Sequence, residues 1–198
     1  IEIYANIMNI YSGLRREGEQ TMAQNSGILI LVYQDEPQLL KQARHDAGIL
    51  LRIAPDTERL GTKTITRLVK IIEEVRPSVL YLFADFNKKG MLYDDENRSI
   101  SLAQLMQRAE AAGVALFFIA NEVNPDILSP NIKPSTRAMI FAAMLDRNKH
   151  FAGWLEKLFR ETIHSGDFIM AYMKLSPQVR QIQNKMPLPG SVVIPPQG

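Results

Sequence analysis

The chain has 198 residues, of which 46% are hydrophobic and 22% are charged, and its formal net charge is +2. This composition is typical of one globular domain with a buried core, and because the basic residues form no stripe, nucleic acid is not an expected partner. The chain contains no cysteine, which excludes disulfides, thiolate zinc sites and a cysteine nucleophile, and it has neither a membrane-length apolar run nor a recognisable signal peptide, so we expect a cytoplasmic protein without membrane contact.

The first part of the chain predicts a helical segment followed by two strands and two helices. Apolar residues recur at helical spacing in residues 1–24, which we assign to an N-terminal helical segment separate from an α/β domain of residues 25–198. Ile28–Tyr33 is a run of β-forming residues without polar interruption, as in strands covered on both faces. The elements expected next are a helix from Pro37 to Gly48, a strand at 49–53 and a helix at 62–75.

The middle of the chain predicts a third strand, a hairpin, a third helix and a fourth strand. The helix is recognised by Ser101, whose hydroxyl can cap a helix start, and by apolar residues spaced three and four apart after it. Both strands are short apolar runs that are followed by an acidic residue. In chain order, these elements are the strand Val79–Phe83, the hairpin around Leu92 and Tyr93, the helix after Ser101 and the strand that follows Gly113 and ends before Glu122.

The last third of the chain contains a loop with three prolines and predicts two helices and an edge strand. Residues 137–145 are apolar over a length that suits a helix or a strand, so periodicity alone does not decide between them. Ser165 and Gly166 separate a helix with a wide apolar stripe from a last helix at residues 167–175. Residues 191–194 would form an edge strand, because prolines surround them.

The alternation of strands and helices predicts an α/β fold with a mostly parallel sheet and right-handed crossovers. No glycine motif for a nucleotide or a phosphate is present, and none of His45, His150 and His164 ends a predicted strand. No Ser-His-Asp group and no metal-binding histidine spacing is found. The sequence therefore predicts no cofactor.

Three acidic residues, Asp35, Asp85 and Glu122, each follow a predicted parallel strand. The carboxyl ends of parallel strands meet at one edge of a sheet, so these residues would share a site there. Carboxylates in such a place would bind a metal ion such as Mg²⁺ or act as a general acid and base. The alternative is that they are exposed residues at the rim of the sheet, and that Asp35 favours a helix N-terminus.

The order of several segments resembles the CHAT branch of the caspase-like peptidases over roughly residues 27–175. The strand after Pro77 resembles the family segment that ends in the catalytic histidine, and Asp85 takes the place of that histidine. The strand end Ile119-Ala120-Asn121-Glu122 resembles the segment that ends in Asn-Ala-Cys, with Glu122 at the cysteine. Residues 92–105 resemble the connection between these strands, and residues 137–145 resemble the next strand, which two terminal helices follow.

This resemblance implies a three-layer α/β/α caspase-like fold on which the N-terminal helix packs, with residues 137–145 as a strand. It implies no working protease, because Asp85 and Glu122 stand where a histidine and a cysteine must act together. The implied function is that of a catalytically degenerate pseudo-protease. Such a module would bind protein partners in a larger assembly or in covalently linked domains, as in bacterial signalling or defence.

Two other functions remain open. In the first, Asp85 and Glu122, with Asp35, would form a carboxylate-based or metal-dependent enzyme site, since two neighbouring carboxylates tend to raise the pKa of one of them. The second is a receiver-like or TIR-like α/β signalling domain. Asp35, Glu36 and Asp85 match acidic positions of a receiver, whereas Lys133 is a poor match to the receiver's lysine.

Overall fold

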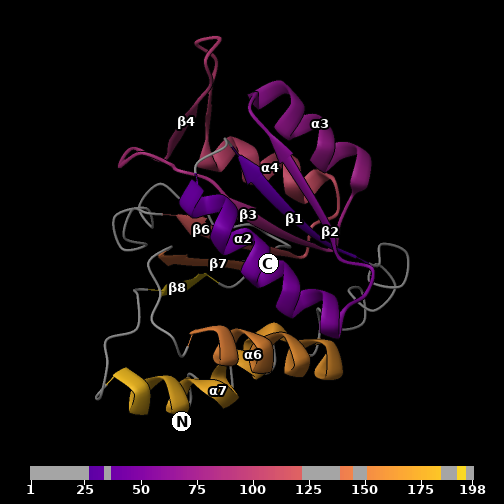
Figure 1. The fold of residues 1–198 in the computed structure, drawn as a ribbon, viewed down its shortest axis with the longest axis vertical. Coiled ribbons are helices and arrows are strands. Elements are labelled where there is room, and N and C mark those ends of the chain that lie inside the picture. Colours follow the sequence, from indigo (N-terminus) through magenta and orange to yellow (C-terminus); the bar gives the residue numbers. More distant parts are fainter. Residues whose placement is uncertain (1–26, 34–36, 122–138, 145–150, 184–190, 195–198) are drawn as a thin grey trace.

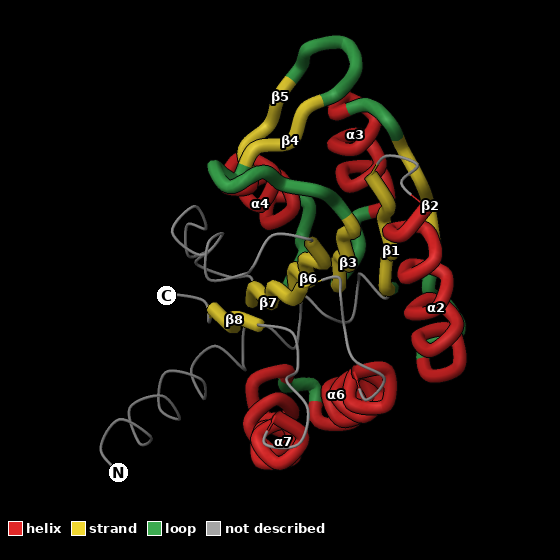
Figure 2. Tube along the Cα trace, turned by 60° about the vertical axis from the view of Figure 1, so that its left-hand side comes forward, coloured by secondary structure: helices red, strands yellow, loops and turns green. Residues whose placement is uncertain are grey.

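A computed structural model describes residues 27–33, 37–121, 139–144, 151–183 and 191–194. These residues form a six-stranded sheet with helices on both of its faces (Figures 1 and 2). The predicted three-layer α/β/α architecture is therefore confirmed. Helices α3 (Ile65–Val75) and α4 (Leu102–Ala111) cover one face, and α2 (Pro37–Ile53), α6 (Phe151–Ser165) and α7 (Phe168–Gln183) cover the other.

The strand order in the sheet is β2-β1-β3-β6-β7-β8. The first five of these strands run parallel to one another, and β8 pairs antiparallel with β7 at the edge. This order confirms both the mostly parallel sheet and the predicted C-terminal edge strand. The strands are β1 (Ile28–Tyr33), β2 (Glu58–Thr62), β3 (Val79–Phe83), β6 (Leu116–Asn121), β7 (Met139–Met144) and β8 (Ser191–Ile194).

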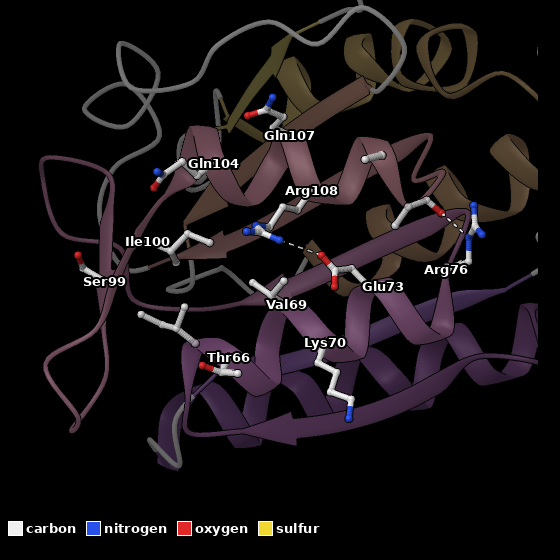
Figure 3. Close-up of a pocket in the computed structure, with 13 residues that line it drawn as sticks. Thr66, Val69, Lys70, Glu73, Arg76, Ser99, Ile100, Gln104, Gln107 and Arg108 are labelled. Atoms are coloured by element: carbon white, nitrogen blue, oxygen red, sulfur yellow. Dashed lines mark hydrogen bonds and ion pairs between the residues drawn. The ribbon is translucent and has the colours of Figure 1, made fainter.

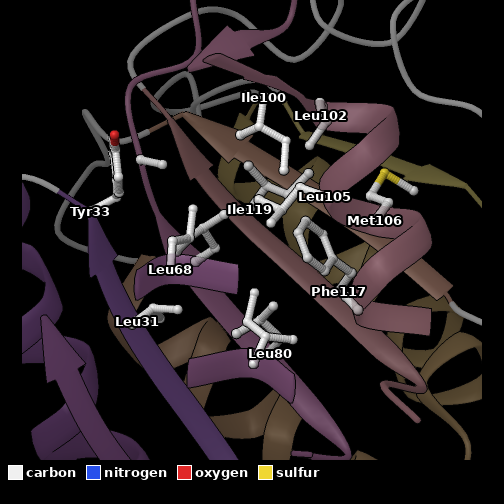
Figure 4. Close-up of a cluster of buried hydrophobic side chains, with 14 of the residues drawn as sticks. Leu31, Tyr33, Leu68, Leu80, Ile100, Leu102, Leu105, Met106, Phe117 and Ile119 are labelled. Atoms are coloured by element: carbon white, nitrogen blue, oxygen red, sulfur yellow. The ribbon is translucent and has the colours of Figure 1, made fainter. Parts of the chain in front are cut away.

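The alternation of side chains along the strands divides the core into two clusters, one of which is drawn in Figure 4. Leu29 and Leu31 of β1 pack with α3 and α4, whereas Ile30 and Val32 pack with the helices of the other face. All six residues of β1 are buried, because helices cover the strand on both sides. The uninterrupted apolar run in the sequence follows from this double coverage.

The structure corrects the prediction for the first helix and the second strand. Gly48 does not end the helix: α2 continues to Ile53, so residues 49–53 are helical. A glycine inside a helix costs only about 1 kcal/mol, and the burial of Ala47 and Leu50 against the sheet outweighs that cost. The second strand is β2, which is exposed along most of its length and lacks the apolar run that marks the central strands.

Capping contacts explain where α3 and α4 begin and end. Helix α3 starts after Thr64, whose side chain accepts the backbone N–H of Arg67 at 3.3 Å, slightly later than predicted. It ends at Arg76, which adopts the left-handed conformation with φ 51°. Helix α4 starts at a capping box formed by Ser101 and Gln104, which confirms the predicted cap.

The remaining elements are found with shifted ends. Strands β4 (Met91–Tyr93) and β5 (Ser99–Ser101) form the predicted hairpin. Strand β7 lies in the segment 137–145, for which periodicity alone allowed either a helix or a strand. Helices α6 and α7 separate near Gly166, and α7 extends to Gln183, beyond its predicted end. The N-terminal segment 1–24 and the proline-containing loop lie outside the described residues. Within the described ranges, no helix is both long and apolar enough to cross a bilayer.

Candidate functional site

Strands β3 and β6, which the candidate residues Asp85 and Glu122 follow in the sequence, run parallel to each other. At the carboxyl edge of the sheet, Phe83, the last residue of β3, pairs with Ala120, and β6 continues for one residue to Asn121. The N–H of Ala84 donates to the carbonyl oxygen of Ala120 at 3.2 Å. Asp85 follows β3 and is exposed to solvent. In the sequence, Asp85 and Glu122 each come two residues after the pair formed by Phe83 and Ala120.

The other two candidate carboxylates, Asp35 and Glu122, lie outside the described residues. Of the three, the structure therefore places only Asp85, and it does not show them together. Over the part of the chain that is described, no group of three His, Asp or Glu side chains could hold a metal ion. A metal site formed by Asp35, Asp85 and Glu122 stays a prediction.

Tyr33 joins the end of β1 to the hairpin. Its side chain is buried, and its hydroxyl donates to the backbone carbonyl oxygen of Tyr93 at 2.9 Å. Burial, followed by the negative charges of Asp94 and Asp95, raises the pKa of Tyr33 to about 12. The hydroxyl of Tyr33 therefore remains a neutral donor at physiological pH and fixes the backbone of the hairpin at Tyr93.

The carboxylate of Asp94 joins the hairpin to α3. Its side chain is buried and accepts the backbone N–H of Ile65 at 3.2 Å, the backbone N–H of Arg98 at 2.9 Å and Nε of Arg98 at 3.1 Å. Burial alone would raise the pKa of Asp94, but these backbone N–H groups and the guanidinium of Arg98 outweigh burial and hold the pKa below its ordinary value. The charge also lies at the N-terminus of α3, where the helix dipole favours an anion.

We predict that Asp94→Asn lowers the melting temperature by about 3–6 °C at neutral pH, because a neutral amide accepts these hydrogen bonds less strongly. A depressed pKa stabilises the folded state above the ordinary pKa of an aspartate, and this stabilisation is lost as the pH falls through the lower pKa of the folded state. The melting temperatures of the two proteins should therefore converge in acid. Asp95→Asn, at an exposed neighbour, is the control, and a difference that persists unchanged in acid would contradict the prediction.

A buried carboxylate that the sequence analysis missed lies on the inner face of α2. Asp46 is 0% exposed, and it accepts hydrogen bonds from the hydroxyl of Tyr81 and, at 2.9 Å, from Nε2 of Gln42. Nδ1 of His45 lies 3.3 Å from the same carboxylate. Asp46 comes three residues after Ala43, which is buried, so the two residues lie on the same face of the helix. This spacing was the feature of the sequence that could have indicated the burial of Asp46.

An open groove of about 1200 Å³ runs between α3 and α4 (Figure 3). Glu73, the carboxylate in its lining, pairs with Arg108 at 3.0 Å. Nε of Arg76 donates to the backbone oxygen of Ala112 at 3.4 Å and joins the ends of the two helices. We call this the α3–α4 groove. Its lining combines the apolar side chains Ile65, Val69, Ile100, Ala111 and Ala112 with the cations Lys70, Arg76 and Arg108.

Comparison of the sequence with protein-family models finds no model that matches this chain, and a search of curated proteins finds no match. The resemblance to the CHAT branch therefore depends on the order of segments in the sequence and stays a prediction. The structure adds the α/β class, the mostly parallel sheet and the position of Asp85 after β3.

Proposed function

We propose that this chain is a non-catalytic caspase-like module that binds other proteins within a larger assembly. The observation that carries the proposal is that Phe83 at the end of β3 pairs with Ala120 near the end of the parallel neighbour β6, and that Asp85 and Glu122 each come two residues after this pair in the sequence. In a caspase-like peptidase, these places would hold the histidine that accepts a proton and the thiol that attacks a carbonyl carbon. With carboxylates at both places, the chain lacks the proton acceptor and the nucleophile of such a peptidase. This favours a role in binding over one in catalysis.

The order of the C-terminal elements supports the same proposal. Strand β7 follows β6 in the sheet, and the two helices α6 and α7 come after it in the chain, as the resemblance implies. Two features of the described surface are suited to protein contacts. They are the α3–α4 groove and the hairpin of β4 and β5, whose Tyr93 is 53% exposed.

Because the chain contains no cysteine, the proposed layout can be tested with a single introduced thiol. In Glu122→Cys, the pKa of this thiol is measured from the pH dependence of its alkylation. If positions 85 and 122 face each other, the carboxylate of Asp85 disfavours the thiolate, and adding Asp85→His should lower the thiol pKa by at least about one unit. The unmodified protein is expected to hydrolyse no member of a broad peptide library.

Ile163→Cys is the matched control, because Ile163 is 53% exposed on α6. The pKa of its thiol should be the same with and without Asp85→His. If the pKa of the thiol in Glu122→Cys is also the same with aspartate and with histidine at position 85, the caspase-like layout is wrong. The receiver-like alternative would then be favoured, because receivers share the parallel strand order 2-1-3-4-5 that β2, β1, β3, β6 and β7 show. Peptide hydrolysis by the unmodified protein would instead support the carboxylate-based enzyme.

A further inference from the structure

We propose that two copies of this chain associate by a reciprocal contact, in which the hairpin tip of each copy docks into the α3–α4 groove of the other. The hairpin tip is the segment from Tyr93 to Arg98. The inference rests on the proposed role in protein binding and names a second copy of the chain as the partner. Three observations carry it: the charges of the two surfaces, the exposed aromatic side chain at the tip, and the position of the tip next to the groove.

The charge of the hairpin tip is negative. It contains the three carboxylates of Asp94, Asp95 and Glu96 and the single guanidinium of Arg98, so its net charge is −2. Asp94 is buried, and Arg98 pairs with both Asp94 and Glu96. The exposed carboxylates of the tip are therefore those of Asp95 and Glu96. The tip therefore presents a negative potential to an approaching surface.

The charge of the α3–α4 groove is positive. Its lining contains Lys70, Arg76 and Arg108 against the single carboxylate of Glu73, so the lining has a net charge of +2. Lys70 also pairs with Glu74, which lies outside the lining, at 3.5 Å. These three cations stand beside the apolar side chains of the lining. Opposite potentials of this kind speed encounter and set the orientation of two surfaces, even where they add little affinity.

The exposed ring of Tyr93 supplies an apolar anchor for the contact. Tyr93 is 53% exposed although it belongs to a strand, and its backbone is held in place by the hydroxyl of Tyr33. A tyrosine on a rigid backbone loses little conformational entropy when it is buried, and such residues often dominate the energy of an interface. The apolar part of the groove lining is the complementary surface.

The position of the tip makes a reciprocal contact the simplest arrangement. The hairpin projects from the body of the molecule beside the start of α3 (Figures 1 and 2), where Arg98 donates to the hydroxyl of Thr66 at 2.9 Å. Thr66 also lines the groove, as do Ser99 and Ile100 of the hairpin itself. Because tip and groove are adjacent in one molecule, a two-fold axis can bring each tip to the groove of the other copy at once.

The test is the concentration dependence of the molecular mass in solution, measured by sedimentation velocity on the full chain. We expect a weak dimer that forms between micromolar and submillimolar concentrations. Because opposite charges face each other in the proposed contact, the dimer should weaken at least about tenfold when the salt rises from about 50 mM to about 500 mM. Tyr93→Ser/Asp95→Lys alters the tip, and Lys70→Gln/Arg108→Gln alters the groove. Each double variant alone should remain monomeric over the same range.

A mixture of the two double variants is the decisive measurement. The tip of the groove variant and the groove of the tip variant are both intact, so the mixture should recover one of the two contacts and dimerise more than either variant alone. Arg44→Gln/Lys157→Gln removes two exposed cations elsewhere and should dimerise like the unmodified protein. Three results would overturn the proposal. The unmodified protein could stay monomeric at low salt, it could form species larger than a dimer, or each double variant could dimerise as the unmodified protein does. None of these results affects the thiol test, so the two proposals can fail separately.

Discussion

Phe118→Ala is expected to destabilise the protein by about 3–5 kcal/mol. Phe118 lies on β6 and is 0% exposed. The centroid of its ring is 4.1 Å from that of Tyr81 and 6.2 Å from that of Phe159 on α6. Its removal would leave a cavity between the sheet and α6 that the close-packed neighbours could fill only in part.

The free energy of unfolding of Phe118→Ala is measured by chemical denaturation at equilibrium. Ile163→Ala, at an exposed position on α6, is the control and should change the free energy of unfolding by less than about 0.5 kcal/mol. A loss of less than about 1 kcal/mol for Phe118→Ala would show that the ring is not part of a well-packed core.

Tyr81→Phe should destabilise the protein by about 2–4 kcal/mol, although it removes a single oxygen atom. The hydroxyl of Tyr81 donates to the buried carboxylate of Asp46, and its loss leaves this carboxylate with one hydrogen-bond donor fewer. Burying a charge without its partners is costly because the group has lost its water. The effect should therefore exceed that of an ordinary tyrosine hydroxyl.

Tyr33→Phe is the matched control, because the hydroxyl of Tyr33 donates to a neutral backbone carbonyl; we expect a loss of about 1 kcal/mol. The double variant Asp46→Asn/Tyr81→Phe completes the cycle. Its destabilisation should be smaller than the sum of the two single changes, because each single change already breaks the same contact. Additive effects, or equal losses for Tyr81→Phe and Tyr33→Phe, would show that Asp46 does not depend on Tyr81.

The elements that the sequence predicted correctly are those whose cause is local. The uninterrupted apolar runs of β1 and β3 reflect burial on both faces, and Ser101 caps α4 with its own side chain. The predicted position of the second strand was wrong because β2 is an edge strand. Its extended structure comes from pairing with β1 and not from apolar residues of its own. The prediction that the helix ends at Gly48 failed for a related reason, since packing against the sheet stabilises the helix on both sides of this residue.

The candidate site was less predictable than the fold. Asp94 and Asp95 are adjacent and chemically identical in the sequence, yet only Asp94 is buried. The difference depends on the N–H of Ile65, which lies 29 residues away in the chain. Asp46 was overlooked because Tyr81, whose hydroxyl donates to it, is 35 residues away in the chain. The proximity of Asp85 and Glu122 stays a prediction, which the introduced thiol will test.

The sequence by itself determined that this is an α/β protein without cysteine chemistry, and it located most strands and helices, because composition and short-range spacing are enough for these properties. Only the tertiary structure decided the order of the strands, the edge position of β2 and the helices that line the α3–α4 groove. It also decided which carboxylates are buried. These features depend on contacts between residues far apart in the chain, and the free energy of such contacts comes from removing water between surfaces that the linear sequence does not place together.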